Sequence, residues 1–136
     1  MRPIIVDANI AFSTLVRNQG DLRARFDSPQ DARFIAPRFV IVEIFKYKEQ
    51  ILRKSGLTEE ELLTALYALV SCLEFVDEKT IPIGTWLEAR RLCAPTDPKD
   101  TPYVALALHH DAELWTRDDE LKEGLRARGF SKFYEP

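Results

Sequence analysis

The sequence lacks the features that mark several classes of protein. Its two cysteines, Cys72 and Cys93, are far apart in apolar helical contexts, form no Cys-x-x-Cys pair, and have no histidine at zinc-ligand spacing. We expect buried thiols, and we set aside thiol catalysis and structural zinc. No apolar run approaches the roughly 20 residues of a membrane helix, and the N-terminus does not resemble a signal peptide. The expected location is cytoplasmic, without a membrane partner.

An excess of positive charge is also absent. Lys and Arg number 19 against 22 Asp and Glu, which leaves a formal net charge of −3. Proteins that bind nucleic acid through their own cations are usually basic, so a nucleic-acid role here would need a local basic patch, metal ions, or both. With 46% hydrophobic and 30% charged residues, residues 1–136 are expected to form a single globular domain with a sizeable core.

Short apolar runs alternate with helical patterns along the chain. Strands are predicted at residues 3–6, 34–36, 73–76 and 113–116, with a further edge strand near residues 130–134. Helices are predicted at residues 10–16, 21–26, 38–54, 58–70, 82–92 and 103–109, with a last helix ending near residue 129. This alternation predicts an α/β fold with a mainly parallel sheet of four to five strands.

The clearest helix boundary signals lie between residues 54 and 61. Gly56 suits a helix C-cap, and Thr58 with Glu61 forms the capping-box pattern of a helix start. The two flanking helices are therefore expected to form an αα-hairpin. The second helix is expected to bury its six large apolar residues, namely Leu62, Leu63, Leu66, Tyr67, Leu69 and Val70.

Four acidic residues stand where the predicted strands end or the predicted helices begin. Asp7 directly follows the first strand, and Asp118 lies two residues past the fourth. Asp100 precedes the apolar helix at residues 103–109, and Glu43 lies in the first turns of the long helix. Right-handed crossovers bring such positions to one edge of a parallel sheet, where ligands usually bind. The sequence can therefore place four carboxylates around one spot.

A cluster of carboxylates calls for a cation. These groups are ionised at neutral pH, and like charges at close range raise one another's pKa. Mg²⁺ and Mn²⁺ prefer oxygen ligands and commonly act with substrate phosphates. Such an ion can orient a water molecule and lower its pKa for attack on a phosphodiester. The pattern therefore indicates metal-dependent phosphodiester hydrolysis.

Each acid also has a structural interpretation. Asp100 and Asp118 stand immediately before helices, where Asp is a favoured N-cap. Glu43 can form a solvated i,i+3 ion pair with Lys46. Asp7 is harder to explain in this way, because it follows three β-branched residues and lies close to the core, where charges are rarely unpaired. Capping and metal binding are compatible, since a carboxylate has two oxygens.

Four further residues border the predicted site. Asn9 and Thr116 can hydrogen-bond the carboxylates or a metal-bound water, or serve only as turn residues. Lys46 and Arg117 can hold phosphate, although as surface residues they need no special explanation.

The ordered set of these pieces resembles a PIN domain, the nuclease family that includes toxins of many prokaryotic toxin–antitoxin pairs. The matching pieces are Ile5-Val6-Asp7-Ala8-Asn9, Ala36-Pro37 followed by Glu43, Asp100-x-x-Tyr103-Val104-Ala105-Leu106-Ala107-Leu108, and Trp115-Thr116-Arg117-Asp118. The resemblance implies a three-layer α/β/α fold and Mg²⁺- or Mn²⁺-dependent cleavage of single-stranded RNA, often by a homodimer. It also implies an antitoxin partner for a member that acts as a toxin.

By position, Asp7, Glu43, Asp100 and Asp118 match the family's four acidic site residues, and Asn9 and Thr116 match frequent polar neighbours. Asp97 competes with Asp100, and Asp119 and Glu120 compete with Asp118. We favour Asp100 because it holds the position before the apolar helix, and Asp118 because it is the first acid of its run.

Two other functions are compatible with parts of this pattern. The first is a non-catalytic PIN-fold module that binds RNA or protein and uses its acids as helix caps. The second is a phosphotransferase or phospho-accepting receiver domain. That class would want an adjacent acid after the first strand and, for a receiver, a lysine after a late strand, whereas this chain has Asp7-Ala8-Asn9 and Thr116-Arg117-Asp118.

Overall fold

The computed structural model describes residues 2–17, 24, 26 and 31–136, and these contain one four-stranded sheet of order β3-β2-β1-β4. Its strands are β1 (Arg2–Val6), β2 (Ala32–Pro37), β3 (Glu74–Val76) and β4 (Glu113–Trp115). All neighbouring strands are parallel, as predicted. The expected strand near residues 130–134 is only an isolated parallel bridge between Leu114 and Phe133.

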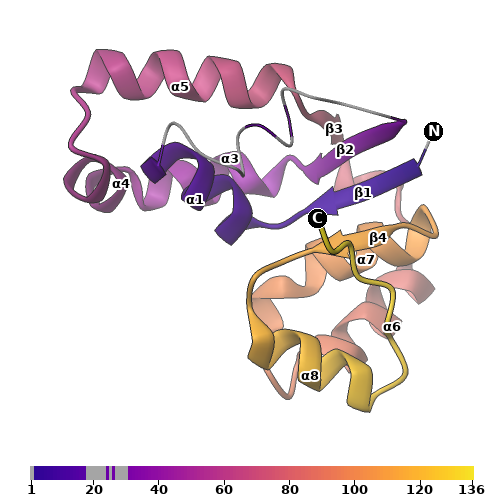
Figure 1. The fold of residues 1–136 in the computed structure, drawn as a ribbon. Helices are drawn as coiled ribbons and strands as arrows, with labels where there is room; N and C mark the ends of the chain where they lie inside the picture. Colours follow the sequence, from indigo (N-terminus) through magenta and orange to yellow (C-terminus); the bar gives the residue numbers. More distant parts are fainter. Residues whose placement is uncertain (1, 18–23, 25, 27–30) are drawn as a thin grey trace.

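Helices cover the sheet on two sides (Figure 1). One group comprises α1 (Ala8–Arg17), α3 (Phe39–Lys46), α4 (Lys48–Ser55) and α5 (Glu59–Ser71). The other comprises α6 (Ile83–Cys93), α7 (Thr101–His109) and α8 (Asp119–Ala127). In the first group α1 packs against the other three helices, and in the second α6 packs against α7 and α8. The three-layer α/β/α architecture is therefore confirmed. Among the described residues, no helix is long and apolar enough to cross a membrane.

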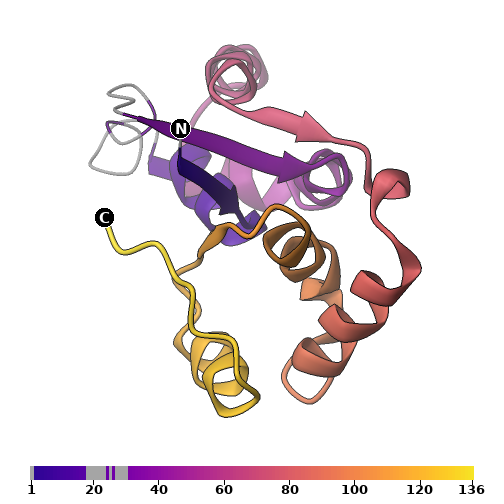
Figure 2. The same cartoon turned by 90° about the vertical axis from the view of Figure 1, so that its right-hand side faces the viewer.

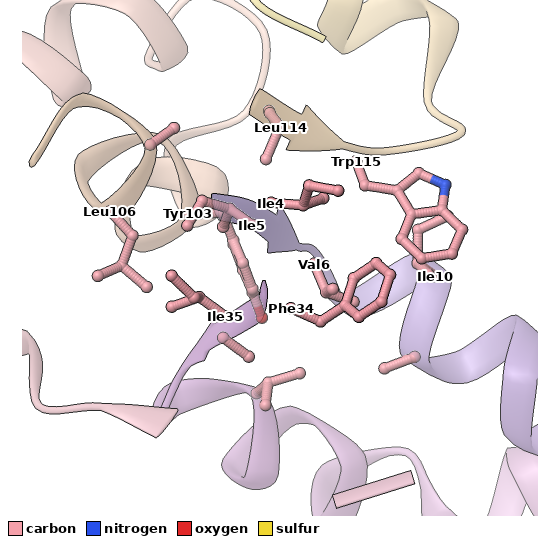
Figure 3. Close-up of a cluster of buried hydrophobic side chains, with 14 of the residues drawn as sticks. Ile4, Ile5, Val6, Ile10, Phe34, Ile35, Tyr103, Leu106, Leu114 and Trp115 are labelled. Carbon is pink, nitrogen blue, oxygen red and sulfur yellow. The ribbon is translucent and has the colours of Figure 1, made fainter. Parts of the chain in front are cut away.

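The core forms around β1 and α7. Ile4, Ile5 and Val6 are fully buried, as expected for a parallel strand covered on both faces. Helix α7 packs against β1, β2 and β4, and its residues 103–107 are all buried. Figure 3 shows side chains of α7 and of the strands meeting in this cluster. The apolar character of α7 in the sequence thus reflects its central position.

The long helix predicted at residues 38–54 is instead two helices. It breaks at Tyr47, whose φ of −107° and ψ of 17° lie outside the α-helical range. Helix α3 contacts β2 as well as α1, whereas α4 packs along α1. The apolar stripe continues through the break, which is why periodicity alone did not reveal it. A second prediction, a helix at residues 21–26, falls mostly outside the described residues.

Helix α5 begins as predicted but buries less of its surface than predicted. Its capping box is confirmed, because Thr58 Oγ1 accepts from the Glu61 N–H at 3.1 Å and Glu61 Oε1 accepts from the Thr58 N–H at 3.0 Å. Its burial was overestimated, since Leu63 and Tyr67 are 51% and 67% exposed. The helix buries one face only, and both α4 and α5 pack against α1.

The connections create a switch point between β1 and β4. From β1 the chain proceeds through α1 to β2 and on to β3, and it then crosses back to add β4 on the other side of β1. Figure 2 shows β1 and β2 pointing the same way, with helices α6, α7 and α8, coloured from salmon to yellow, below them in the view. In open parallel sheets, ligands bind outside the carboxyl ends of strands at such a point. Asp7 and Thr116 are the residues that follow these two strands.

Candidate active site

Asp7 is held at the end of β1 by three contacts. Its N–H donates to the carbonyl of Trp115 at 3.3 Å, and its Oδ1 accepts from the N–H of Ile10 at 3.1 Å, capping the first turn of α1. Its carboxylate also receives a hydrogen bond from the side chain of Thr116. With 3% of its surface exposed, Asp7 is the one buried residue among those described that carries a charged side chain.

Thr116 connects the residues that leave the sheet beside Asp7. Val6 pairs with Trp115, so the next residues on each strand, Asp7 and Thr116, emerge side by side. The Thr116 Oγ1 accepts from Asn9 Nδ2 at 3.4 Å and from the Asp118 N–H at 3.1 Å. A hydrogen bond from this buried hydroxyl also lowers the pKa of Asp7, against the effect of burial. Asp7, Asn9, Thr116 and Asp118 therefore form one hydrogen-bonded group.

The structure distinguishes the acids that act as caps from those that do not. Asp118 Oδ1 accepts from the Leu121 N–H at 3.1 Å and caps α8. Asp97 accepts from the Lys99 N–H at 3.0 Å and caps the short 3-10 turn η2 (Pro98–Asp100). Asp100 precedes α7 but makes no side-chain capping bond. The capping interpretation thus holds for Asp118 and Asp97 and fails for Asp100.

Glu43 is half-buried on α3 and has a partner that the sequence analysis did not single out. The hydroxyl of Tyr103, on α7, donates to Glu43 Oε1. Tyr103 is 1% exposed, and Figure 3 shows its side chain extending from α7 among the apolar side chains of the cluster. A hydroxyl-bearing residue in an otherwise apolar helix, three positions after Asp100, was the available signal.

The pKa values show that the acids lie within electrostatic range of one another. Burial, followed by repulsion from Asp100 and Asp118, raises the pKa of Asp7 to about 7 against the hydrogen bonds it accepts. Burial, followed by repulsion from Asp97, Asp118 and Glu43, raises the pKa of Asp100 to about 7. Burial also raises the pKa of Glu43, against the opposing hydrogen bond from Tyr103. Repulsion thus couples Asp7 to Asp100 and Asp118, and Asp100 to Glu43.

A groove of about 350 Å³ opens at this point. Four acids line it, namely Asp7, Glu43, Asp97 and Asp100. Its other walls include apolar and aromatic residues from α1 and α4 and from the junction of α3 with α4, namely Phe12, Val16, Tyr47 and Ile51. Lys54 and Lys99 add positive charge, and Asn9 and Gln50 add amides. The groove therefore combines an acidic end, an apolar wall and basic residues.

The two basic residues predicted at the site lie on different sides of it. Lys46 is exposed, lowers the pKa of Glu43 by its charge, and holds its Nζ 5.4 Å from the ring centroid of Tyr47. The backbone N–H of Arg117 donates to Asn9 Oδ1 at 3.3 Å. Arg117 also lines a second groove of about 490 Å³, together with Arg17 and Thr116. Both residues are thus next to the acidic cluster without joining it.

The donor set suits a hard divalent cation. In the described part of the chain, no three acidic, His or Cys side chains already stand close enough together to hold one ion directly. Mg²⁺, however, keeps several waters and is usually bound through one or two carboxylates together with substrate phosphates. Asp7 and Asp100, whose charges are destabilised by burial and by repulsion from neighbouring acids, are the carboxylates that such an ion would relieve.

Comparisons with known proteins agree with this description. A family model described as a PIN domain matches residues 5–133. A chain in the crystal structure of VapBC2 from Rickettsia felis, bound to a DNA fragment from their promoter, is similar in fold with a TM-score of 0.69. The similarity covers 89% of this chain and 92% of that chain at 15% sequence identity. A search of curated proteins found no match.

Proposed function

The chain belongs to the PIN domain family, and from this premise we propose that it is a divalent-metal-dependent nuclease. We infer that it is an endoribonuclease that hydrolyses phosphodiester bonds of single-stranded RNA with Mg²⁺ or Mn²⁺. The observation that carries the proposal is the pair Asp7 and Asp100 at the switch point, where burial and repulsion from neighbouring acids raise both pKa values to about 7. Burying two ionised carboxylates costs free energy, and a bound cation would offset that cost.

We assign the metal to Asp7, Asp100, Asp118 and Glu43. Asp7 and Asp118 each use one oxygen as a helix cap and keep a second oxygen for a ligand. Asp100 makes no side-chain cap bond to its helix. When bound, Mg²⁺ or Mn²⁺ supplies Lewis-acid activation of a water molecule and stabilises the oxygen that leaves the phosphate. The chain's own part is to hold the carboxylates in place.

The neighbouring residues support that task. Hydrogen bonds of Asn9 to Thr116 and to the N–H of Arg117 hold the loop after β4 next to Asp7. They limit reorganisation of the carboxylates. Tyr103 fixes one oxygen of Glu43. Lys46 and Arg117 stand beside the acids and would hold phosphates of the substrate strand. Together these contacts describe a preorganised, acid-lined site.

The test is cleavage of a panel of single-stranded RNAs with Mn²⁺, Mg²⁺ or EDTA. Wild-type protein should cleave with either metal and not in EDTA. Asp7→Asn and Asp100→Asn should each lose cleavage by at least about 100-fold, since each removes a charged ligand. Asp119→Asn is the matched control, because Asp119 is exposed and adjacent to Asp118. Undiminished cleavage by both site variants would contradict the proposal.

We further propose that the chain acts as the toxin of a toxin–antitoxin pair, in the cytoplasm and as a homodimer. The support is family membership and the likeness in fold to a chain of VapBC2, which was solved bound to promoter DNA. The measurements are co-purification with the product of the adjacent gene and light scattering of the isolated chain. Inhibition of RNA cleavage by that gene product would identify it as the antitoxin.

A second candidate function is a non-catalytic binding module for RNA or protein. The observation that favours it is the use of Asp7, Asp97 and Asp118 as helix caps. Thermal melting with and without Mn²⁺ separates the two functions. An occupied metal site stabilises the folded state by about 2.7 kcal/mol at a metal concentration of 100 Kd, whereas caps alone give no metal-dependent shift.

A further inference from the structure

Part of the groove beside the acids is aromatic and has no task in the metal chemistry. The rings of Phe12 and Tyr47 lie with centroids 5.6 Å apart and planes at 70°. Both residues line the groove and both are partly exposed. The two rings come from different elements, α1 and the junction between α3 and α4. This is therefore a surface built by tertiary packing at the edge of an open groove.

The order of residues along the two walls gives the groove a direction. On α1, Asn9 is followed by Phe12 and Val16, which lie on successive turns. On the opposite wall, Glu43 is followed four residues later by Tyr47. The aromatic pair thus lies about one helical turn from the acidic end. Further along the second wall the lining continues with Gln50, Ile51 and Lys54.

The charges around the two rings suit a phosphate backbone. Lys54 and Lys99 line the same groove. Lys46 holds its Nζ 5.4 Å from the centroid of the Tyr47 ring. Gln50 is exposed and offers an amide donor and acceptor for the edge of a base. Aromatic rings with cations beside them are the usual means by which proteins hold single-stranded nucleic acid.

We propose that Phe12 and Tyr47 form a subsite that stacks one unpaired base of the substrate strand, next to the phosphate held at the acids. The inference rests on the proposed function, because the strand it places is the substrate of that site. A base inside a duplex is already stacked and paired, so its faces cannot reach the rings. The subsite thus accounts for a preference for single strands. It is tolerant of sequence, since every base has a π-face.

The test is fluorescence titration of single-stranded RNA octamers in EDTA at low salt, where binding is measured without cleavage. One octamer carries 2-aminopurine at its centre, and the second, abasic octamer has the same sugar–phosphate backbone without any base; both carry a 5′-fluorescein label. Wild-type protein should bind the intact octamer about tenfold more tightly than the abasic one, and the 2-aminopurine emission should fall on binding.

Two substitutions at one position separate stacking from other roles of Tyr47. Tyr47→Leu keeps apolar volume but removes the ring, and it should lower the affinity for the intact octamer about tenfold without changing that for the abasic octamer. Tyr47→Phe keeps the ring and should bind like wild type. Phe12→Leu should behave like Tyr47→Leu. Tyr67→Leu is the control, because Tyr67 is exposed on α5 and outside the groove.

The outcomes separate this inference from the proposed function. Equal binding of intact and abasic octamers by wild-type protein would overturn the stacking subsite even if RNA is cleaved. An equal loss of affinity by Tyr47→Leu for both octamers would overturn it as well, because the ring would then act on something other than the base. Absence of metal-dependent cleavage, with base-dependent binding intact, would overturn the nuclease and leave the subsite in place. Melting temperatures of all variants, measured alongside, show that each is folded.

Discussion

Tyr103 on α7 donates its hydroxyl hydrogen to Glu43 on α3, across sixty residues of sequence and between the two helical layers. The tyrosine is buried, and the carboxylate is half-buried beside the acidic cluster. The bond fixes one oxygen of Glu43, and Glu43 also lines the groove. Tyr103 is therefore a positioning residue for a proposed metal ligand.

Tyr103→Phe should weaken Mn²⁺ binding about tenfold, because partners that orient a ligand are typically worth 10- to 100-fold in metal affinity. Its cost in stability should be only about 1 kcal/mol, since one hydrogen bond is lost while the ring is kept. Calorimetric titration with Mn²⁺ gives the affinity, and urea unfolding gives the stability. Tyr67→Phe, at an exposed tyrosine, is the matched control. An unchanged Mn²⁺ affinity would show that the bond serves folding alone.

The metal-free protein should lose stability as the pH rises from about 4 to about 7. The pKa values of Asp7 and Asp100 are raised from 3.8 to about 7, so in this range the folded state binds more protons than the unfolded state, and the free energy of unfolding falls. Above about pH 7 both states are deprotonated and the loss levels off.

His110 opposes this trend, because burial lowers its pKa and the unfolded state then binds the extra proton below pH 6.5. Two carboxyl groups outweigh one histidine, and His110→Gln removes the opposing contribution. Urea unfolding in EDTA at several pH values measures the slope. A stability that rises between pH 5 and 7 in His110→Gln would contradict the prediction. Saturating Mn²⁺ should reverse the slope, because the metal binds the ionised carboxylates.

Asp7→Asn should make the metal-free protein more stable at pH 8 while removing the proposed activity. The amide is neutral, so it avoids the cost of a buried charge, and its oxygen can still accept from the Ile10 N–H. The expected gain is about 1 to 3 kcal/mol, measured by urea unfolding in EDTA. Asp119→Asn, at an exposed acid, should change stability by less than about 0.5 kcal/mol. A less stable Asp7→Asn would show that the carboxylate is well compensated without a cation.

Two substitutions at Asp118 separate its structural role from its proposed chemical role. Asp118→Ala removes the bond to the Leu121 N–H and should cost about 1 kcal/mol of stability, whereas Asp118→Asn keeps a cap and should cost little. Both should lose metal-dependent RNA cleavage. Thermal melting and a cleavage assay on the same preparations give the two readouts. Full cleavage by Asp118→Asn would show that Asp118 acts only as a helix cap.

Much of the fold was predictable because its signals are local. The β-branched run Ile4-Ile5-Val6 is buried on both faces in β1, and the Thr58 capping box needs only residues three positions apart. Alternation of strands and helices then restricts the sheet to parallel connections. Asp7 and Asp118 could be placed at one edge for the same reason, since each follows a strand whose direction the topology sets.

Other features depended on contacts between distant segments. The break at Tyr47 separates a helix that packs on both β2 and α1 from one that packs on α1, while their apolar stripe runs on without interruption. The exposure of Leu63 depends on what covers α5, which no local pattern encodes. The sequence favoured Asp100 over Asp97 by its position before the apolar helix, but only the hydrogen bonds of the structure show that Asp97 is a cap and Asp100 is not.

The sequence by itself determined a parallel α/β domain with carboxylates at the ends of its strands, because hydrophobic periodicity and strand ends are properties of short segments. Only the tertiary structure decided how those carboxylates are held and what surrounds them. The hydroxyl of Thr116 beside Asp7, the bond from Tyr103 to Glu43 and the pairing of Phe12 with Tyr47 all join residues that are far apart in the chain. Such contacts arise from packing between distant segments, and the spacing of these residues along the chain does not predict them.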